Sequence, residues 1–138
     1  MSRHGELSYA EQICDRAYPF QEERQMNKVE AIIRSEKLEV VKNALTEAGY
    51  VGLNTVNVTG RGNQRGVVHT GRGAQAIEID MLPKIKLEMV VKSEDTDSVC
   101  HIIMDAARTG NIGDGKIFVS PISAVYRVRT GERDEAAL

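Results

Sequence analysis

The chain has 138 residues, of which 41% are hydrophobic and 28% charged, and this composition supplies enough apolar surface for one folded domain. Its 18 Lys and Arg against 20 Asp and Glu give a net charge of −2, which argues against nucleic acid as a partner because the strong positive field is missing. Two cysteines and no long apolar stretch argue against a disulfide framework, a signal peptide or a membrane span. We therefore expect a cytoplasmic protein without direct membrane insertion.

The first 25 residues differ from the rest of the chain. They mix charges with scattered apolar residues such as Tyr9 and Ile13, and Pro19 interrupts any helical pattern. We expect residues 1–25 to be a flexible N-terminal extension and residues 26–138 to form the domain. A start at Met26 in the cell is an alternative hypothesis.

The domain begins with a predicted strand at 28–33, followed by a helix that Ser35 caps and Gly49 ends. The apolar residues of this helix are spaced by three, four and three residues: Leu38, Val41, Leu45 and Ala48. Alternating apolar residues then predict strands at 55–59 and 85–91.

A second helix is predicted after an acidic start at 93–95, and it ends before Gly110. Short strands follow at 117–119 and 124–128. The order predicts an α+β fold, a ferredoxin-like βαββαβ sandwich with an extra C-terminal strand. Two helices cover only one sheet face, so we expect the other face to be buried by self-association.

The segment 61–82 between two of the strands is longer than the 12 to 15 residues, roughly, that compact domains use for plain connections. Such loops usually carry function. Its opening, 60–66, holds three glycines and two arginines but does not meet the dinucleotide fingerprint. By itself this opening is equally compatible with a soluble flexible linker.

The segment 110–116, Gly-Asn-Ile-Gly-Asp-Gly-Lys, has glycines close enough for backbone N–H groups to converge on a phosphate. It is not a true P-loop, because Ile117 stands where a magnesium-binding hydroxyl belongs and the segment leads from a helix into a strand. Read alone, it indicates either a phosphate contact or a tight structural turn.

Arg127 and Arg129 are two residues apart on a predicted strand, so both guanidinium groups would leave one sheet face and could hold one polyphosphate. The alternative is a pair of solvated surface charges. The three histidines are dispersed, and Glu78 and Asp80 alternate with isoleucines at the end of the long loop. We therefore expect neither a metal cluster nor a catalytic residue.

Taken in order, five segments of the chain resemble the nitrogen regulatory P-II family. They are 60–66, 71–74, 82–84, 109–119 and 127–132. Their intervals fit as well, and the match covers 26–138 nearly end to end. The resemblance implies a signalling protein for nitrogen, carbon and energy status, and not an enzyme. It also implies a homotrimer of ferredoxin-like subunits, in which 61–82 is the family's T-loop.

The resemblance further implies ligands. ATP or ADP would lie in clefts between neighbouring subunits, with 2-oxoglutarate beside ATP through Mg²⁺. By position, the nucleotide would be bound by Ile32, Gly60, Glu88, Val90, Gly113, Asp114, Gly115, Lys116, Arg127 and Arg129. The residues expected at 2-oxoglutarate are Gln64, Gly66, Lys84 and Gly113, and Gln64 would also help to hold Mg²⁺.

Arg72 corresponds to the arginine that family members insert into an ammonium channel. The resemblance therefore implies an ammonium transporter as the first partner, ahead of an enzyme of nitrogen metabolism. The loop departs from some relatives, because Ala76 replaces a tyrosine that they uridylylate and Ala74 replaces a phosphorylated serine. Two other classes compete with this interpretation: a small ATP-hydrolysing or phosphotransfer enzyme using Lys116, and a ferredoxin-like trimer that binds metal or serves assembly.

Overall fold

The structure is a computed structural model, and it describes residues 25–62, 66–69, 76–79 and 81–138. For 66–69 and 76–79 it describes the backbone alone. The predicted N-terminal extension, except Gln25, lies outside the described residues, and so do Gln64 and Arg72 at the base and tip of the long loop.

Four strands form one antiparallel sheet in the order β2-β5-β1-β6. The two halves of the fold contribute alternate strands, as a split βαβ arrangement requires. The bounds are β1 Met26–Ile33, β2 Asn54–Gly60, β5 Leu82–Lys92 and β6 Lys116–Pro121.

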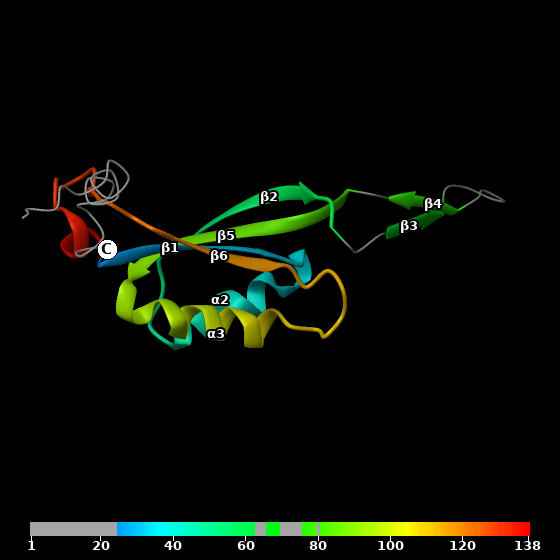
Figure 1. Cartoon of the computed structure of the whole chain (residues 1–138), viewed down its shortest axis with the longest axis horizontal. Coiled ribbons are helices and arrows are strands. Elements are labelled where there is room, and N and C mark those ends of the chain that lie inside the picture. The colour runs from blue at the N-terminus through cyan, green and yellow to red at the C-terminus, as the bar shows by residue number, and fades with distance from the viewer. Residues whose placement is uncertain (1–24, 63–65, 70–75, 80) are drawn as a thin grey trace, which may run out of the picture.

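Two helices, α2 (Leu38–Glu47) and α3 (Thr96–Ala107), lie side by side under one face of the sheet (Figure 1). A 3-10 turn precedes each of them, η1 (Ser35–Lys37) and η2 (Ser93–Asp95). The prediction that the Ser35 side chain caps the first helix is wrong, because Ser35 begins η1 and no side-chain cap bond forms there. Gly49 does end that helix, with a φ of 95°. The predicted α+β, ferredoxin-like class is confirmed.

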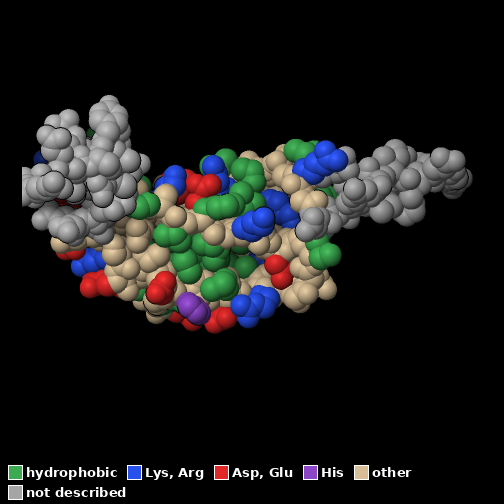
Figure 2. Space-filling view, viewed as in Figure 1, with side chains coloured by type: hydrophobic (Ala, Val, Ile, Leu, Met, Phe, Trp, Pro, Cys, Tyr) green, Lys and Arg blue, Asp and Glu red, His purple; other side chains and the backbone are tan. Residues whose placement is uncertain are grey.

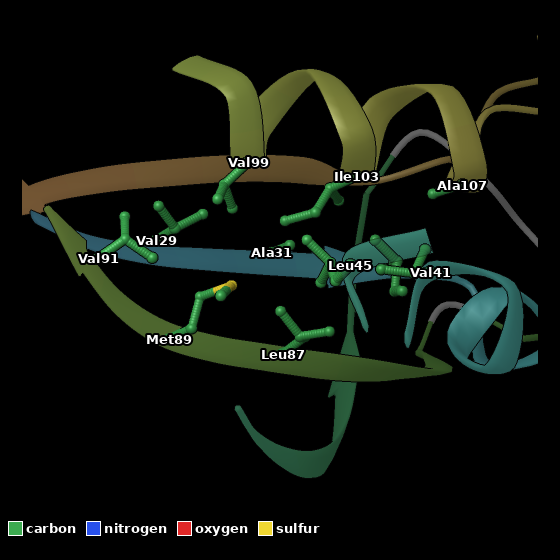
Figure 3. Packing of buried hydrophobic residues seen from close by; sticks show 11 residues of the cluster. Val29, Ala31, Val41, Leu45, Leu87, Met89, Val91, Val99, Ile103 and Ala107 are labelled. Atoms are coloured by element: carbon green, nitrogen blue, oxygen red, sulfur yellow. The ribbon is translucent and has the colours of Figure 1, made fainter. Parts of the chain in front are cut away.

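The hydrophobic core lies between the helices and the inner two strands (Figure 3). Apolar residues at alternate strand positions face apolar helix residues at three- and four-residue spacing. The strands contribute Val29, Ala31, Ile33, Leu87, Met89 and Val91, and the helices Val41, Leu45, Val99, Ile103 and Ala107. This burial fixes which strand residues point away from the helices.

Those outward-pointing residues form what we call the open face. Directly paired residues share a face, and the registers assign to it Lys28, Glu30, Ile32, Val56, Val58, Lys84, Lys86, Glu88, Val90, Lys116, Phe118 and Ser120. Val56 is 55% and Phe118 51% exposed. Figure 2 shows further hydrophobic side chains at the surface where α3 lies below β6. This apolar exposure agrees with the expectation of self-association.

The structure differs from the sequence prediction in two further places. The long loop contains a hairpin, β3 (Gly66–His69) paired with β4 (Ala76–Ile79), which projects beyond the end of the sheet (Figure 1). The strand expected at 124–128 is reduced to one bridge between Tyr126 and Arg133. A strand needs a hydrogen-bonded neighbour, and here the segment turns back on itself before a short 3-10 helix, η3 (Asp134–Ala137).

Candidate functional site

The segment 110–116, which we call the glycine loop, connects α3 with β6 at one end of the sheet (Figure 1). Its backbone turns sharply, since Gly110, Gly113 and Gly115 have φ values of 87°, 104° and 100°. Only glycine adopts such values without strain. The loop thus leaves the helix layer and enters the edge strand β6 within a few residues.

The Asp114 side chain closes this loop on itself. Its carboxylate accepts hydrogen bonds from the Thr109 hydroxyl, from the Thr109 and Gly110 N–H groups at 2.9 Å each, and from Arg34 Nε at 3.1 Å. These donors, the Thr109 hydroxyl foremost, hold the pKa of the Asp114 carboxyl well below its usual range. The carboxylate of Asp114, a predicted nucleotide residue, is thus engaged inside the loop, which leaves its backbone to face a ligand.

Two cations from neighbouring strands hold the other side of the loop. Arg34, just after β1, donates from Nη2 to the Ile112 carbonyl at 2.7 Å, in addition to its bond with Asp114. Lys84 on β5 donates from Nζ to the Gly113 carbonyl at 2.7 Å. Burial, and then the nearby Arg34 charge, lower the pKa of the Lys84 ammonium. The base of the long loop and the glycine loop are therefore in direct contact.

Lys116 begins β6 and is directly paired with Ile32, so both predicted nucleotide residues lie on the open face beside the glycine loop. Glu88 and Val90 lie on the same face farther along β5. Glu88 faces Glu30, and Lys28 lies within 3.7 Å of one carboxylate and 3.5 Å of the other. Gly60, at the end of β2, is paired with Leu82.

Arg127 and Arg129 lie far from the glycine loop of the same subunit. The glycine loop and the C-terminal segment lie at opposite ends of β6 (Figure 1). The six residues of β6 span about 20 Å. Arg127 forms an ion pair with Glu132 and donates to the Leu138 carbonyl at 3.4 Å. The prediction that Arg127 and Arg129 lie on one strand and leave the same sheet face is wrong. The segment 124–128 is not a strand, and the chain turns at 128–130.

The structure adds two residues to which the sequence analysis gave no role, Arg34 and Thr109. Arg34 follows β1 by one position and gave no signal in the sequence. Thr109 stands five residues before Asp114, and this short spacing was the only feature of the sequence that could have indicated a contact between them. Of the predicted 2-oxoglutarate residues, Gly66 begins β3, whereas Gln64 lies outside the described residues.

Metal clusters and membrane-spanning helices are both absent from the described ranges. No three His, Cys, Asp or Glu side chains gather there in a way that could hold a metal ion. None of the helices in that part of the chain is long and apolar enough to cross a membrane.

Comparisons with known proteins agree with one another. The family model described as Nitrogen regulatory protein P-II matches residues 26–132. A relative named Nitrogen regulatory protein P-II 2 from Methanothermobacter thermautotrophicus is 50% identical over 113 residues, covering 82% of this chain and 97% of that protein. Nitrogen regulatory protein P-II of Rhodobacter capsulatus is 51% identical over 113 residues, 82% of this chain and all of the relative.

A solved structure is similar as well. The crystal structure of Arabidopsis thaliana PII bound to citrate has a TM-score of 0.68 and is 42% identical, covering 83% of this chain and 92% of the other.

Proposed function

This chain belongs to the nitrogen regulatory protein P-II family, and from that premise we propose that it reports cellular nitrogen, carbon and energy status by binding ATP or ADP and 2-oxoglutarate. The domain at 26–138 carries the ligand sites, and residues 1–25 form an N-terminal extension. The ligands act on partner proteins through the T-loop. A cytoplasmic location suits such ligands.

One observation carries the nucleotide part of the proposal: a glycine loop whose carboxylate is turned inward, with Lys116 on the open face next to it. A loop of this kind offers backbone N–H groups and a cation to an anion. We assign the polyphosphate to Gly113, Asp114 (through its backbone), Gly115 and Lys116. The base and ribose are assigned to Ile32, Gly60, Glu88 and Val90.

The remaining cations require a second subunit. Arg127 and Arg129 follow β6 at its end away from the glycine loop, and β6 alone spans about 20 Å, so they reach a polyphosphate only if a neighbouring copy supplies them. A ring of subunits joined through the open face has this geometry, because each cleft then combines the two ends of adjacent chains. We propose a homotrimer with nucleotide clefts between neighbours.

The second ligand, 2-oxoglutarate, is assigned to the base of the T-loop, where Lys84 contacts the Gly113 carbonyl at 2.7 Å. An ammonium in this place can pair with a carboxylate of the ligand. Gln64 and Gly66 complete the assignment. Mg²⁺ takes few protein ligands when phosphates are present, and the amide oxygen of Gln64 suits it. The ion would supply positive charge to the two anionic ligands.

A regulator agrees better with this site than an enzyme does. Asp114 lies in the loop that is proposed to hold the phosphates, and its hydrogen bonds to Thr109, Gly110 and Arg34 occupy its carboxylate. It is therefore unsuited to accept a proton as a general base. Binding alone is enough for a sensor, because a ligand that prefers one T-loop state shifts the loop population.

The partner proposed first is an ammonium transporter, contacted by Arg72 at the tip of the T-loop; an enzyme of nitrogen metabolism is the alternative. Co-purification with the transporter from detergent extracts, with and without ATP and 2-oxoglutarate, compares the wild type with Arg72→Ala. Loss of the complex in the variant, with nucleotide binding unchanged, is the expected result. Equal recovery of both proteins would contradict this role of Arg72.

Calorimetric titration tests the proposed function. ATP and ADP are titrated into the protein with and without Mg²⁺ and 2-oxoglutarate, in parallel with Lys116→Ala. We expect ATP binding that 2-oxoglutarate with Mg²⁺ strengthens about fivefold or more, and that Lys116→Ala weakens. If neither nucleotide binds, the sensor proposal fails. Steady release of phosphate from ATP that Lys116→Ala abolishes would favour the enzyme.

A further inference from the structure

Thr109 occupies an exposed position two residues after the end of α3, yet its hydroxyl has both a donor and an acceptor role. It donates to Asp114 Oδ1 and accepts from the Asn111 N–H at 3.2 Å. The Thr109 N–H also donates to Asp114, at 2.9 Å. Thr109 thus makes three hydrogen bonds within the segment 109–114, which overlaps the proposed phosphate site at 113–116.

These bonds determine which backbone groups remain available. Asp114 and Thr109 take up the N–H groups of Thr109, Gly110 and Asn111 at the beginning of the loop. Among the described residues, no hydrogen bond uses the N–H of Gly113 or Gly115. Both of these N–H groups lie within three residues of Lys116, where an anion would gain both backbone donors and a cation.

The same bonds keep a competing charge out of the site. A free Asp114 carboxylate would repel a polyphosphate, and it could accept hydrogen bonds from the N–H groups that the polyphosphate needs. Arg34, at 3.1 Å, neutralises the carboxylate from the side of β1. The Thr109 hydroxyl donates a hydrogen bond to the same carboxylate from the side of α3.

We propose that Thr109 is a positioning residue of the nucleotide site: its hydroxyl holds the Asp114 carboxylate inside the glycine loop, so that the Gly113 and Gly115 N–H groups are presented to the phosphates of a nucleoside di- or triphosphate. This inference rests on the proposed function and adds to it a residue that does not touch the ligand. Serine carries the same hydroxyl and valine has nearly the same shape without it. The two substitutions therefore separate the hydrogen bond from the packing.

The experiment compares Thr109→Val with Thr109→Ser, and uses Thr46→Val, at an exposed site on α2, as the matched control. Amide hydrogen exchange of 110–115 is measured without ligand, and ATP affinity is measured by calorimetry. Thr109→Val should accelerate exchange in the loop and weaken ATP binding about tenfold, as expected for a lost hydrogen bond to a charged group. Thr109→Ser and Thr46→Val should match the wild type in both measurements.

The outcomes are distinguishable. Unchanged exchange in Thr109→Val would show that the hydroxyl does not hold the loop. Faster exchange with unchanged ATP affinity would show that the contact is structural only, and either result overturns the inference. If the wild type binds no nucleotide, the proposed function fails, and with it the role of Thr109 in nucleotide binding.

Discussion

The Ile32 carbonyl oxygen lies where a side chain on Gly115 would have to begin: a Cβ built on Gly115 comes within 1.7 Å of that oxygen. The neighbouring pair Ile32 and Lys116 explains this closeness, because the loop joins β1 as soon as β6 starts. Gly115 also has a φ of 100°. Two independent constraints therefore require glycine at this position.

Gly115→Ala should lower the free energy of unfolding by about 3 kcal/mol or more, since strain at positive φ adds to a clash with backbone. Gly52→Ala is the control, because nothing lies within 4 Å of its added Cβ, and its change should stay within about 0.5 kcal/mol. Urea denaturation followed by circular dichroism gives both values. Equal stabilities of the two variants would contradict the close approach.

The open face can be tested with two matched valines. Val56 on the open face and Val40 on α2 are 55% and 51% exposed. Substitution by aspartate should therefore remove a similar amount of apolar contact within the monomer at either position. Val56→Asp should dissociate the proposed trimer because the charge would be buried between subunits, whereas Val40→Asp should leave it intact. Light scattering after size exclusion gives the mass. A trimer in both variants would place the interface elsewhere.

In the proposed trimer the two ends of each nucleotide cleft would belong to different subunits, so two inactive variants should complement each other. Lys116→Ala and Arg127→Ala should each bind ATP poorly as homotrimers. Co-refolding them in equal amounts should restore about a quarter of the clefts, since each intact cleft needs one unaltered end from each neighbour. Titration with a fluorescent ATP analogue counts the sites.

Distinct affinity tags and native mass spectrometry confirm that mixed trimers form. If mixed trimers bind no more ATP than either parent, Lys116 and Arg127 do not share a cleft. Random exchange of subunits between two wild-type preparations is the control for loss during refolding.

The Asp114 carboxylate should stay ionised where an ordinary aspartate would not. Folding lowers the pKa of this carboxyl group, so the ionised carboxylate stabilises the folded protein at every pH above the unfolded-state pKa of about 3.9. This stabilisation is lost as the pH falls toward and through the lower folded-state pKa. The ¹³C carboxyl signal of Asp114 should therefore not titrate between pH 7 and about 4. Thr109→Val should raise this pKa, since it removes the largest cause of the shift. A midpoint near the ordinary value in the wild type would contradict the hydrogen bonding described above.

Local patterns were enough to predict most of the fold. The stripe from Leu38 to Leu45 and the alternation around Leu87 depend on neighbours within a few residues, so periodicity alone located α2 and β5. The glycines of 110–116 likewise required a sharp turn before any contact was known. Family resemblance then rested on the order and intervals of such segments.

The sequence by itself therefore determined the order of strands and helices, the buried faces and the position of the glycine loop. Only the tertiary structure placed Arg34 against Asp114, 80 residues away, and Lys84 against Gly113. It also turned 126–133 back on itself, where the sequence had predicted a strand at 124–128. The physical reason is that periodicity records burial within one element, whereas a hydrogen bond between distant side chains or a strand pairing depends on which elements the fold brings together.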